Sequence, residues 1–227
     1  MLSRLGVLIS GSGTNLQSII NSIKKGSLKG EIGVVISNRE DAYGLIRAKN
    51  ENIPSFVVSH KIFKSREEHE KEIVKILKNH EVDVVVLAGY MRLITPFFIS
   101  HYPEKILNIH PALLPSFKGV DAQKQAVEYG VKIAGATVHM VDENMDSGPI
   151  IIQGAVCVSD NDTGDTLAEK ILKIEHRIFP QAISWLIEGR IVVHKNKTVL
   201  KRDPSRKSAD ISDLMPCVIN PPLENGF

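Results

Sequence analysis

The feature that most constrains the fold is a run of apolar residues without polar alternation, Val84 to Ala88, which follows Asp83. Strands that are apolar on both faces are typical of parallel sheets covered by helices on either side. Similar β-branched runs occur at 5–9, 32–36 and 55–58, and segments with helical periodicity separate them. This alternation over the first hundred residues predicts a doubly wound α/β arrangement.

The second half of the chain continues the pattern with longer elements. Further strands are expected at 105–109, 133–141 and 150–158, followed by a long helix from about 165 to 187. A hairpin is expected around residues 195–197. We therefore predict an α/β fold with a doubly wound, mostly parallel sheet flanked by helices, and with a C-terminal hairpin and tail.

Residues 203–227 form the predicted tail. Apolar periodicity disappears there and prolines accumulate. A segment of this kind is expected to lie on the surface or to be disordered.

Composition excludes several classes of protein. The 227 residues are 43% hydrophobic with a net charge of +2, which does not indicate a nucleic-acid partner. No stretch approaches the roughly 18 apolar residues of a membrane span, and no signal peptide is recognisable. The two cysteines, Cys157 and Cys217, match no metal-ligand spacing and are expected to be free thiols. A cytoplasmic protein without a membrane partner is therefore predicted.

A glycine-rich segment, Ser10 to Asn15, lies between the first predicted strand and the first helix. Glycines allow the backbone to approach an anion, and the following helix offers its unpaired amides to phosphate. A dinucleotide fingerprint would place its third glycine at Leu16. No ribose-binding acid follows the second strand, although Arg39 would suit the 2′-phosphate of NADP. A single terminal phosphate, a dinucleotide and a structural turn all remain open.

Two side chains at the end of the fifth predicted strand indicate chemistry. Asn108 and His110 are two residues apart, so in a strand they point to the same face. Ligands of such sheets bind at the carboxyl ends of the strands. A carboxamide and an imidazole together suit an oxyanion that forms in a tetrahedral intermediate. The alternative is a capping asparagine with an edge histidine of purely structural use.

A third group is needed to orient and charge the imidazole. The loop before the seventh predicted strand offers three acids, Asp142, Glu143 and Asp146. Gly148 and Pro149 predict a tight turn beside Asp146, and a carboxylate near His110 would favour the imidazolium. Residue spacing alone does not decide which acid reaches the histidine.

Taken together, four motifs resemble the folate-dependent formyltransferases, in particular the phosphoribosylglycinamide formyltransferases of purine biosynthesis. The resemblance covers residues 5 to about 200. The motifs occur in order as Gly11-Ser12-Gly13-Thr14-Asn15, Leu87-Ala88-Gly89-Tyr90-Met91-Arg92, Asn108-Ile109-His110-Pro111-Ala112-Leu113-Leu114-Pro115 and Asp146-Ser147-Gly148-Pro149. The Asn-His-Pro motif is shared by folate formyltransferases generally, whereas the glycine loop is more particular to this group.

The resemblance implies a reaction and a site. The amine of glycinamide ribonucleotide would attack the formyl carbon of 10-formyltetrahydrofolate, the co-substrate, and no metal would take part. Asn108 and protonated His110 would hold the oxyanion, and Asp146 would keep His110 charged. The resemblance also assigns ribonucleotide-binding residues, namely Gly11, Ser12, Gly13, Thr14, Asn15 and Glu175.

The folate would lie over the segment that follows the fourth predicted strand. Its implied contacts are Arg66, Leu87, Met91, Arg92, Leu93, Ile94, Phe98, Asn108, Val141, Asp142 and Glu143. His139 is expected to support the site without taking part in the reaction. A single domain over residues 1–202 is expected, with a phosphate-binding half at about 1–100 and a folate and catalytic half at about 101–202. The partners implied are small-molecule substrates, and the chain is expected to be a monomer or homodimer.

Three other enzymes remain as alternatives. Formyltetrahydrofolate deformylases use the same Asn-His-Asp logic but deliver the formyl group to water, usually with an additional N-terminal regulatory domain. A formyltransferase acting on initiator tRNA would need a C-terminal nucleic-acid-binding domain. An NADP oxidoreductase conflicts with Leu16. A folate or nucleotide binding module would leave the three polar residues without a reason to occur together.

Overall fold

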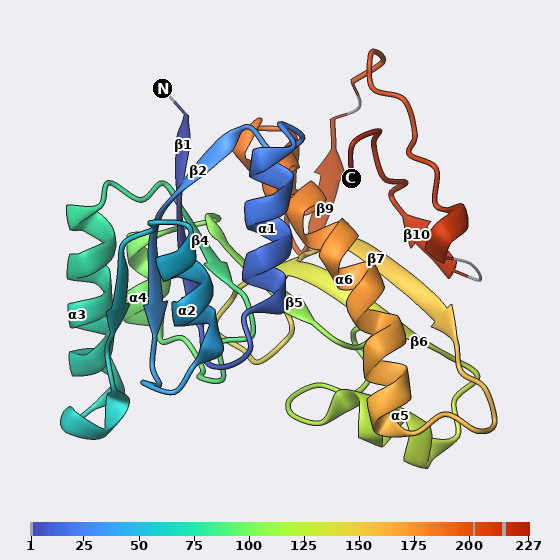
Figure 1. The fold of residues 1–227 in the computed structure, drawn as a ribbon, viewed down its shortest axis with the longest axis horizontal. Coiled ribbons are helices and arrows are strands. Elements are labelled where there is room, and N and C mark those ends of the chain that lie inside the picture. The colour runs from blue at the N-terminus through green and yellow to red at the C-terminus, as the bar shows by residue number, and fades with distance from the viewer. Residues whose placement is uncertain (1, 202, 215–216) are drawn as a thin grey trace. The chain divides into compact units, whose positions relative to one another are not determined.

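The computed structural model describes residues 2–201, 203–214 and 217–227. The chain divides into two compact units (Figure 1). The first contains residues 1–108 and 141–143, and the second contains residues 109–140 and 144–227.

The first unit is built on a parallel sheet. Its strands are β1 (Ser3–Ile9), β2 (Gly30–Ser37), β3 (Ser55–Val57), β4 (Val84–Leu87) and the first three residues of β5 (Ile106–His110), whose last two residues belong to the second unit. They lie in the order β3-β2-β1-β4-β5, and every neighbouring pair is parallel. Because parallel strands need a crossover between them, helices occupy the connections.

These connections contain α1 (Thr14–Lys24), α2 (Tyr43–Asn50), the short η1 (His60–Ile62), α3 (Arg66–Asn79) and α4 (Pro96–His101). α1 and α2 lie side by side (Figure 1). The starts of α3 and α4 are fixed by side-chain caps, which satisfy amides that have no partner within the helix.

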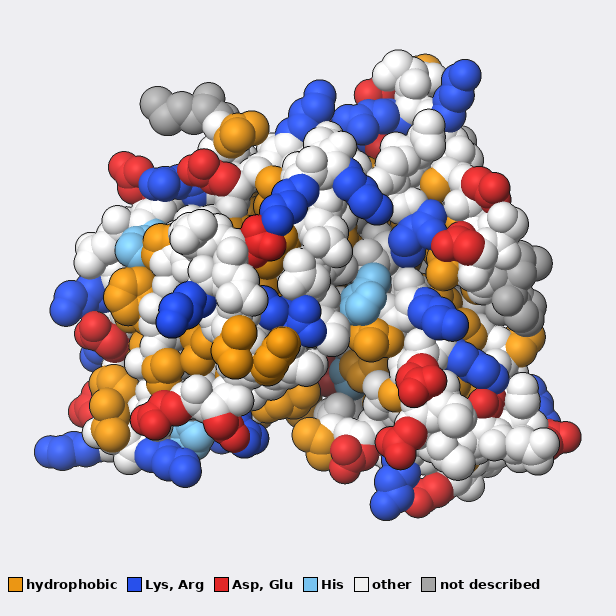
Figure 2. Space-filling model, viewed as in Figure 1, with side chains coloured by type: hydrophobic (Ala, Val, Ile, Leu, Met, Phe, Trp, Pro, Cys, Tyr) orange, Lys and Arg blue, Asp and Glu red, His pale blue; other side chains and the backbone are white. Residues whose placement is uncertain are grey.

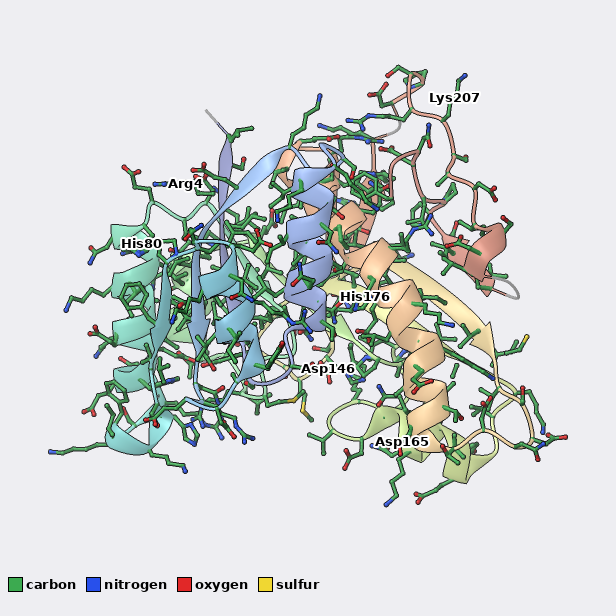
Figure 3. The ribbon with its side chains drawn as sticks, viewed as in Figure 1. Arg4, His80, Asp146, Asp165, His176 and Lys207 are labelled. Atoms are coloured by element: carbon green, nitrogen blue, oxygen red, sulfur yellow. The ribbon has the colours of Figure 1, made fainter. Side chains whose placement is uncertain are left out.

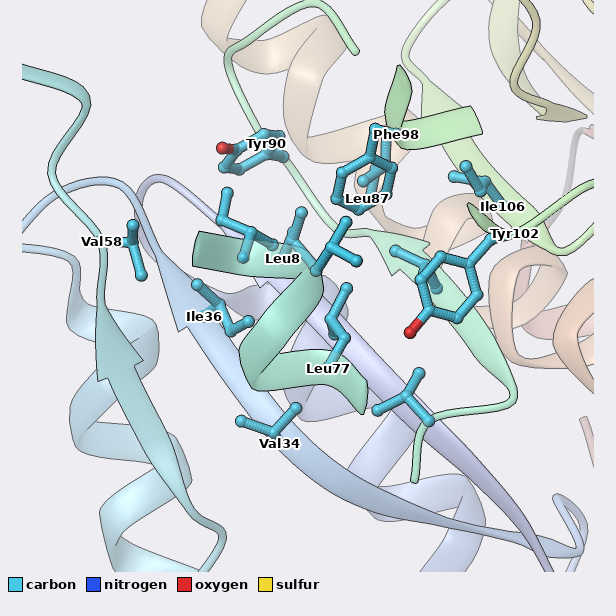
Figure 4. Close-up of a cluster of buried hydrophobic side chains, with 14 residues drawn as sticks. Leu8, Val34, Ile36, Val58, Leu77, Leu87, Tyr90, Phe98, Tyr102 and Ile106 are labelled. Carbon is cyan, nitrogen blue, oxygen red and sulfur yellow. The ribbon is translucent and has the colours of Figure 1, made fainter. Parts of the chain in front are cut away.

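The core of this unit explains why its strands show no alternation. Leu8, Val34 and Val85 pack with residues of α3 and α4 in one buried cluster (Figure 4). Their strand neighbours Val7 and Val35 are also fully buried, and side chains alternate between faces, so both faces of these strands are covered.

The second unit contains an antiparallel set of strands beside two helices. Its strands β6 (Ile133–Met140) and β7 (Ile150–Cys157) pair antiparallel, and its helices are α5 (Ala122–Tyr129) and α6 (Gly164–Ile187). Pro180 lies inside α6. The hairpin predicted around 195–197 is present and consists of β8 (Ile191–His194) and β9 (Lys197–Leu200).

The end of the chain packs against the rest of this second unit. It contains the short η2 (Ser212–Leu214) and strand β10 (Cys217–Asn220), which pairs antiparallel with β7. Arg190 Nη2 lies 2.6 Å from Glu224 Oε1 in an ion pair. The backbone amide of Glu224 donates to Oε1 of Gln181 on α6 at 2.8 Å. The described parts of residues 203–227 are therefore held to the domain by a strand and by ion pairs.

The predicted fold class is confirmed, because parallel pairing dominates and helices flank the sheet. The sequence missed α4, α5 and β10, which are short, and placed most strand ends within a few residues.

Both described cysteines are free thiols. None of the helices in residues 2–201, 203–214 and 217–227 is long and apolar enough to cross a membrane. On the face seen in Figure 2, basic and acidic side chains are intermixed.

Candidate active site

Strand β5 carries the two residues that the sequence predicted at the carboxyl end of a strand, Asn108 and His110. Asn108 is half-buried, and His110, the last residue of the strand, is 4% exposed. Their spacing of two along a strand directs both side chains to one face.

Both ring nitrogens of His110 face oxygen atoms. Nε2 lies 2.8 Å from the carbonyl oxygen of Phe117, and Nδ1 lies 3.4 Å from Oδ2 of Asp146. A neutral imidazole has only one N–H and can donate to one of these acceptors, whereas the imidazolium can donate to both. The arrangement therefore suits a charged ring that has been oriented before the reaction begins.

Asp146 is the acid that the structure brings to the histidine. Its side chain is 12% exposed, and its backbone adopts the left-handed region with φ of 47°. Oδ2 accepts the Gly119 amide at 2.9 Å, and Oδ1 lies 3.7 Å from Nε2 of His139. The loop that precedes β7 thus places the Asp146 carboxylate between two histidines.

The electrostatics of this carboxylate favour its charged form. Burial by itself would raise the pKa of Asp146, but His139, the Gly119 amide and the charge of His110 act against it. The net result is a pKa below the usual value of 3.8. Asp146 is therefore ionised at neutral pH and available to balance an imidazolium.

The segment after His110 is held by side chains that sequence analysis did not identify. Thr137 Oγ1, fully buried on β6, donates to the Ala112 carbonyl at 2.7 Å and accepts the Leu114 amide at 3.1 Å. Gln153 Nε2 donates to Thr137 Oγ1 and to the Leu114 carbonyl. Partners 16 or more residues apart in the sequence leave no local pattern, so only the fold reveals them.

The glycine loop turns from β1 into α1. Gly13 has a φ of 68° and forms the N-cap of α1, so no cap side chain occupies the amides of the first turn. A Cβ at Gly13 would lie 2.6 Å from the Cα of Gly44, whereas a Cβ at Gly11 would meet nothing within 4 Å. Gly13 is therefore required by packing and backbone conformation, and space remains open beside Gly11.

Arg47 supports this loop and was also missed. Its Nε donates to the Ser12 carbonyl at 2.9 Å, and its Nη1 donates to Gln17 of α1 at 3.1 Å. The guanidinium places a positive charge beside the uncapped helix start, where an anion would be stabilised. Leu16, which breaks the dinucleotide fingerprint, is fully buried.

Several of the predicted folate contacts surround the segment after β4. Met91 is 70% exposed and Leu93 is 48% exposed, whereas Leu87 and Phe98 belong to the buried core cluster of this unit. Arg66 is exposed as the first residue of α3. The remaining predicted contacts of this first unit are half-buried or exposed, namely Arg92, Ile94, Val141, Asp142 and Glu143.

Glu175, the predicted contact of the ribosyl group, is 6% exposed on α6, next to His176 (Figure 3). A buried carboxylate is costly unless it is paired or hydrogen-bonded.

Among the residues that the structure describes, no group of three or more histidines, cysteines or acids is arranged to hold a metal ion.

An oriented imidazole, a buried carboxylate and a carboxamide on the same strand as the imidazole are groups of the kind that one class of enzyme uses. Such groups can stabilise a developing oxyanion and transfer one proton, which acyl-type transfer to an amine or to water requires. His110 ends strand β5, and ligand sites in α/β proteins generally lie at the carboxyl ends of the strands.

Comparison with known proteins identifies the group more closely. Residues 3–183 match the formyl transferase family. The chain is 42% identical over 190 residues to the phosphoribosylglycinamide formyltransferase of Escherichia coli, covering 84% of this chain and 90% of the relative. The chain belongs to the formyl transferase family.

Solved structures agree with this assignment. Glycinamide ribonucleotide transformylase 1 from Symbiobacterium toebii superposes with a TM-score of 0.86 at 46% identity, covering 88% of this chain and 94% of that one. A formyltetrahydrofolate deformylase from Pseudomonas syringae is also similar, with a TM-score of 0.82 at 32% identity, covering 88% of this chain and 66% of that one. The resemblance stated from sequence motifs is thereby confirmed.

Proposed function

We propose that the chain transfers the formyl group of 10-formyltetrahydrofolate to the amine of glycinamide ribonucleotide. The products are formylglycinamide ribonucleotide and tetrahydrofolate, in de novo purine biosynthesis. The observation that carries this proposal is His110, whose two nitrogens face Phe117 O and the ionised Asp146, in a chain 42% identical to a phosphoribosylglycinamide formyltransferase.

The chemistry assigned to this chain's residues follows from their donors and charges. As the amine nitrogen bonds to the formyl carbon, the carbonyl oxygen becomes an oxyanion. The Asn108 amide would donate a hydrogen bond to it, and the positive charge of the His110 imidazolium would stabilise it electrostatically. Asp146 would hold the positive charge on His110 throughout. The carbon–N10 bond then breaks, and the proton lost by the amine reaches N10 through water, with Asp146 assisting the relay.

The glycine loop is proposed to bind the phosphate of the ribonucleotide. Uncapped amides at the start of α1 and the nearby Arg47 support this role. The proposed contacts are Gly11, Ser12, Gly13, Thr14 and Asn15, with Glu175 binding the ribosyl portion.

The residues around the segment after β4 fit a folate. Exposed Met91 and Leu93 provide an apolar surface for a flat ring. In the part of the chain that the structure describes, the backbone amides of Arg92, Leu93 and Ile94 donate to no protein oxygen. Apolar surface next to available amides suits a pterin, because its flat ring carries hydrogen-bond acceptors, together with donors, at its polar edge. Val141 N–H already donates to Ile106 O, so this amide is not offered to the pterin.

We further propose that the enzyme acts in the cytoplasm, as a monomer or homodimer, without a nucleic-acid or membrane partner. Free thiols at Cys157 and Cys217 and the mixed surface charges support this.

One assay tests the proposed function against hydrolysis by a deformylase, the alternative to which a solved structure is also similar. The protein is mixed with 10-formyltetrahydrofolate, with and without glycinamide ribonucleotide, and the folate absorbance is followed. Consumption that depends on the ribonucleotide supports the transferase. Equal consumption without it would identify a hydrolase, and no consumption in either mixture would exclude both.

A further inference from the structure

The segment Met91–Thr95, on which the folate is proposed to lie, is fastened to the first unit at its start by a buried serine. Ser10, at 6% exposed, accepts the Met91 amide on its Oγ at 2.8 Å. The same hydroxyl donates to Oδ1 of Asn38 at 2.6 Å, which fixes its orientation. Because its single hydrogen is directed to Asn38, the hydroxyl acts toward the Met91 amide as an acceptor.

The other end of the segment is fastened by a buried acid. Glu70 of α3 is 3% exposed, and its carboxylate accepts the Thr95 amide at 2.9 Å and also the Thr95 hydroxyl. Thr95 Oγ1 in turn caps α4 by accepting the Phe98 amide at 3.5 Å. Burial raises the pKa of Glu70, although its hydrogen bonds to Thr95 oppose the increase. The Glu70 carboxylate is therefore shielded from solvent, and hydrogen bonds join it to Thr95.

These two anchors leave the middle of the segment free. The amides of Arg92, Leu93 and Ile94 lie between the fastened ends, and the side chains of Met91 and Leu93 face solvent. A loop whose ends are fixed loses less conformational entropy when a ligand binds to its centre. The anchors therefore favour binding without contacting the ligand.

Ser10 has a second connection, because it directly precedes Gly11 in the glycine loop. One hydroxyl thus joins the end of β1, where the proposed phosphate loop begins, to the segment proposed for the folate. Glu70 lies on α3, and its hydrogen bonds go to Thr95 at the far end of the segment, away from the glycine loop in the sequence.

We propose that Ser10 and Glu70 are positioning residues that hold Met91–Thr95 ready for the folate, and that Ser10 also couples this segment to the ribonucleotide loop. This inference rests on the proposed function. Both residues hold the same segment, but only Ser10 also adjoins the glycine loop, so their substitutions have different kinetic signatures.

Ser10→Ala and Glu70→Gln test the inference, with Ser37→Ala as the matched control. Ser37 is a fully buried serine at the end of the parallel strand β2, and its hydroxyl bonds to the backbone of Arg39. Tetrahydrofolate binding is measured by anaerobic titration calorimetry, and KM for each substrate by steady-state kinetics.

Ser10→Ala is expected to weaken tetrahydrofolate binding about five- to tenfold, the range of one lost neutral hydrogen bond. It should raise KM for both substrates while kcat stays within about threefold. Glu70→Gln should raise KM for the folate alone. Ser37→Ala should leave the Kd for tetrahydrofolate and both KM values unchanged.

Two results would overturn the inference without touching the proposed function: an active wild-type enzyme whose Ser10→Ala variant binds tetrahydrofolate normally, or equal losses in Ser37→Ala. An inactive wild-type enzyme would instead refute the function. If Ser10→Ala does not fold, Ser10→Cys keeps the side-chain shape, weakens the hydrogen bond and carries the same expectation.

Discussion

Replacing Asp146 with asparagine removes one charge and keeps the shape of the side chain. In the folded chain its carboxylate faces His110 Nδ1 at 3.4 Å and His139 Nε2 at 3.7 Å, and it accepts the Gly119 amide at 2.9 Å. Asparagine can still accept the Gly119 amide through its carbonyl oxygen, but it cannot balance a charged imidazole.

The size of the effect follows from these contacts. Loss of one preorganised oxyanion donor lowers turnover about 100- to 1000-fold, and a histidine left in the wrong tautomer costs about 10⁴-fold in comparable triads. We therefore expect kcat to fall about a thousandfold or more. Because the Gly119 hydrogen bond survives in neutral form, the free energy of unfolding should fall by only about 1–2 kcal/mol.

The assay compares wild type, Asp146→Asn and a control, Asp160→Asn, in ribonucleotide-dependent consumption of 10-formyltetrahydrofolate. Asp160 is an exposed acid paired with Lys132 at 2.5 Å, and exposed pairs of this kind contribute little. Urea unfolding of each variant confirms that the protein is folded during the assay.

Turnover of Asp146→Asn within tenfold of wild type would refute the reasoning. It would mean that another acid charges His110, or that the imidazolium is not required. A loss shared by Asp160→Asn would show that the assay reports general damage to the second unit.

Three further predictions concern the supports of the site. The lowered pKa of Asp146 means that its ionised form stabilises the fold above the unfolded pKa, and this contribution disappears as pH falls through the folded pKa. Urea titrations between about pH 5 and pH 2 should therefore show a steeper loss of stability for wild type than for Asp146→Asn, and parallel curves would contradict this. Thr137→Val leaves the buried Leu114 amide without its acceptor, so the free energy of unfolding should fall by about 1–3 kcal/mol and kcat should decrease; unchanged urea midpoints would count against the role of Thr137. Arg47→Ala should raise KM for glycinamide ribonucleotide about tenfold with kcat retained, as steady-state kinetics would reveal, whereas an unchanged KM would remove Arg47 from the phosphate site.

The fold was predictable where hydrophobic pattern alone decides it. The continuous apolar run at Val84 to Leu87 required cover on both faces, and the structure supplies it. Strand β10 was not predictable, because its four residues, Cys217–Asn220, carry no periodic signal and gain their conformation by pairing with β7. A strand this short is stabilised mainly by the strand it pairs with. For β10 that partner, β7, lies about 60 residues earlier in the sequence.

The site divides in the same way. The spacing of Asn108 and His110 indicated a shared strand face, and the structure places both on β5. Spacing could not select Asp146 from three neighbouring acids, because the choice depends on a loop conformation with positive φ at that residue. Glu70 stands among the acids of α3 and resembles a solvated residue until Thr95, 25 positions later, is folded onto it.

The central claim is that the formyl group passes to the amine of the ribonucleotide. The most direct test uses 10-formyltetrahydrofolate labelled with ¹³C in the formyl carbon, mixed with glycinamide ribonucleotide and the enzyme, with the label followed by NMR. We predict that the ¹³C signal moves to a formamide carbon on the ribonucleotide, at the rate at which tetrahydrofolate forms. Release of the label as formate in the presence of the ribonucleotide would contradict the claim and identify water as the acceptor.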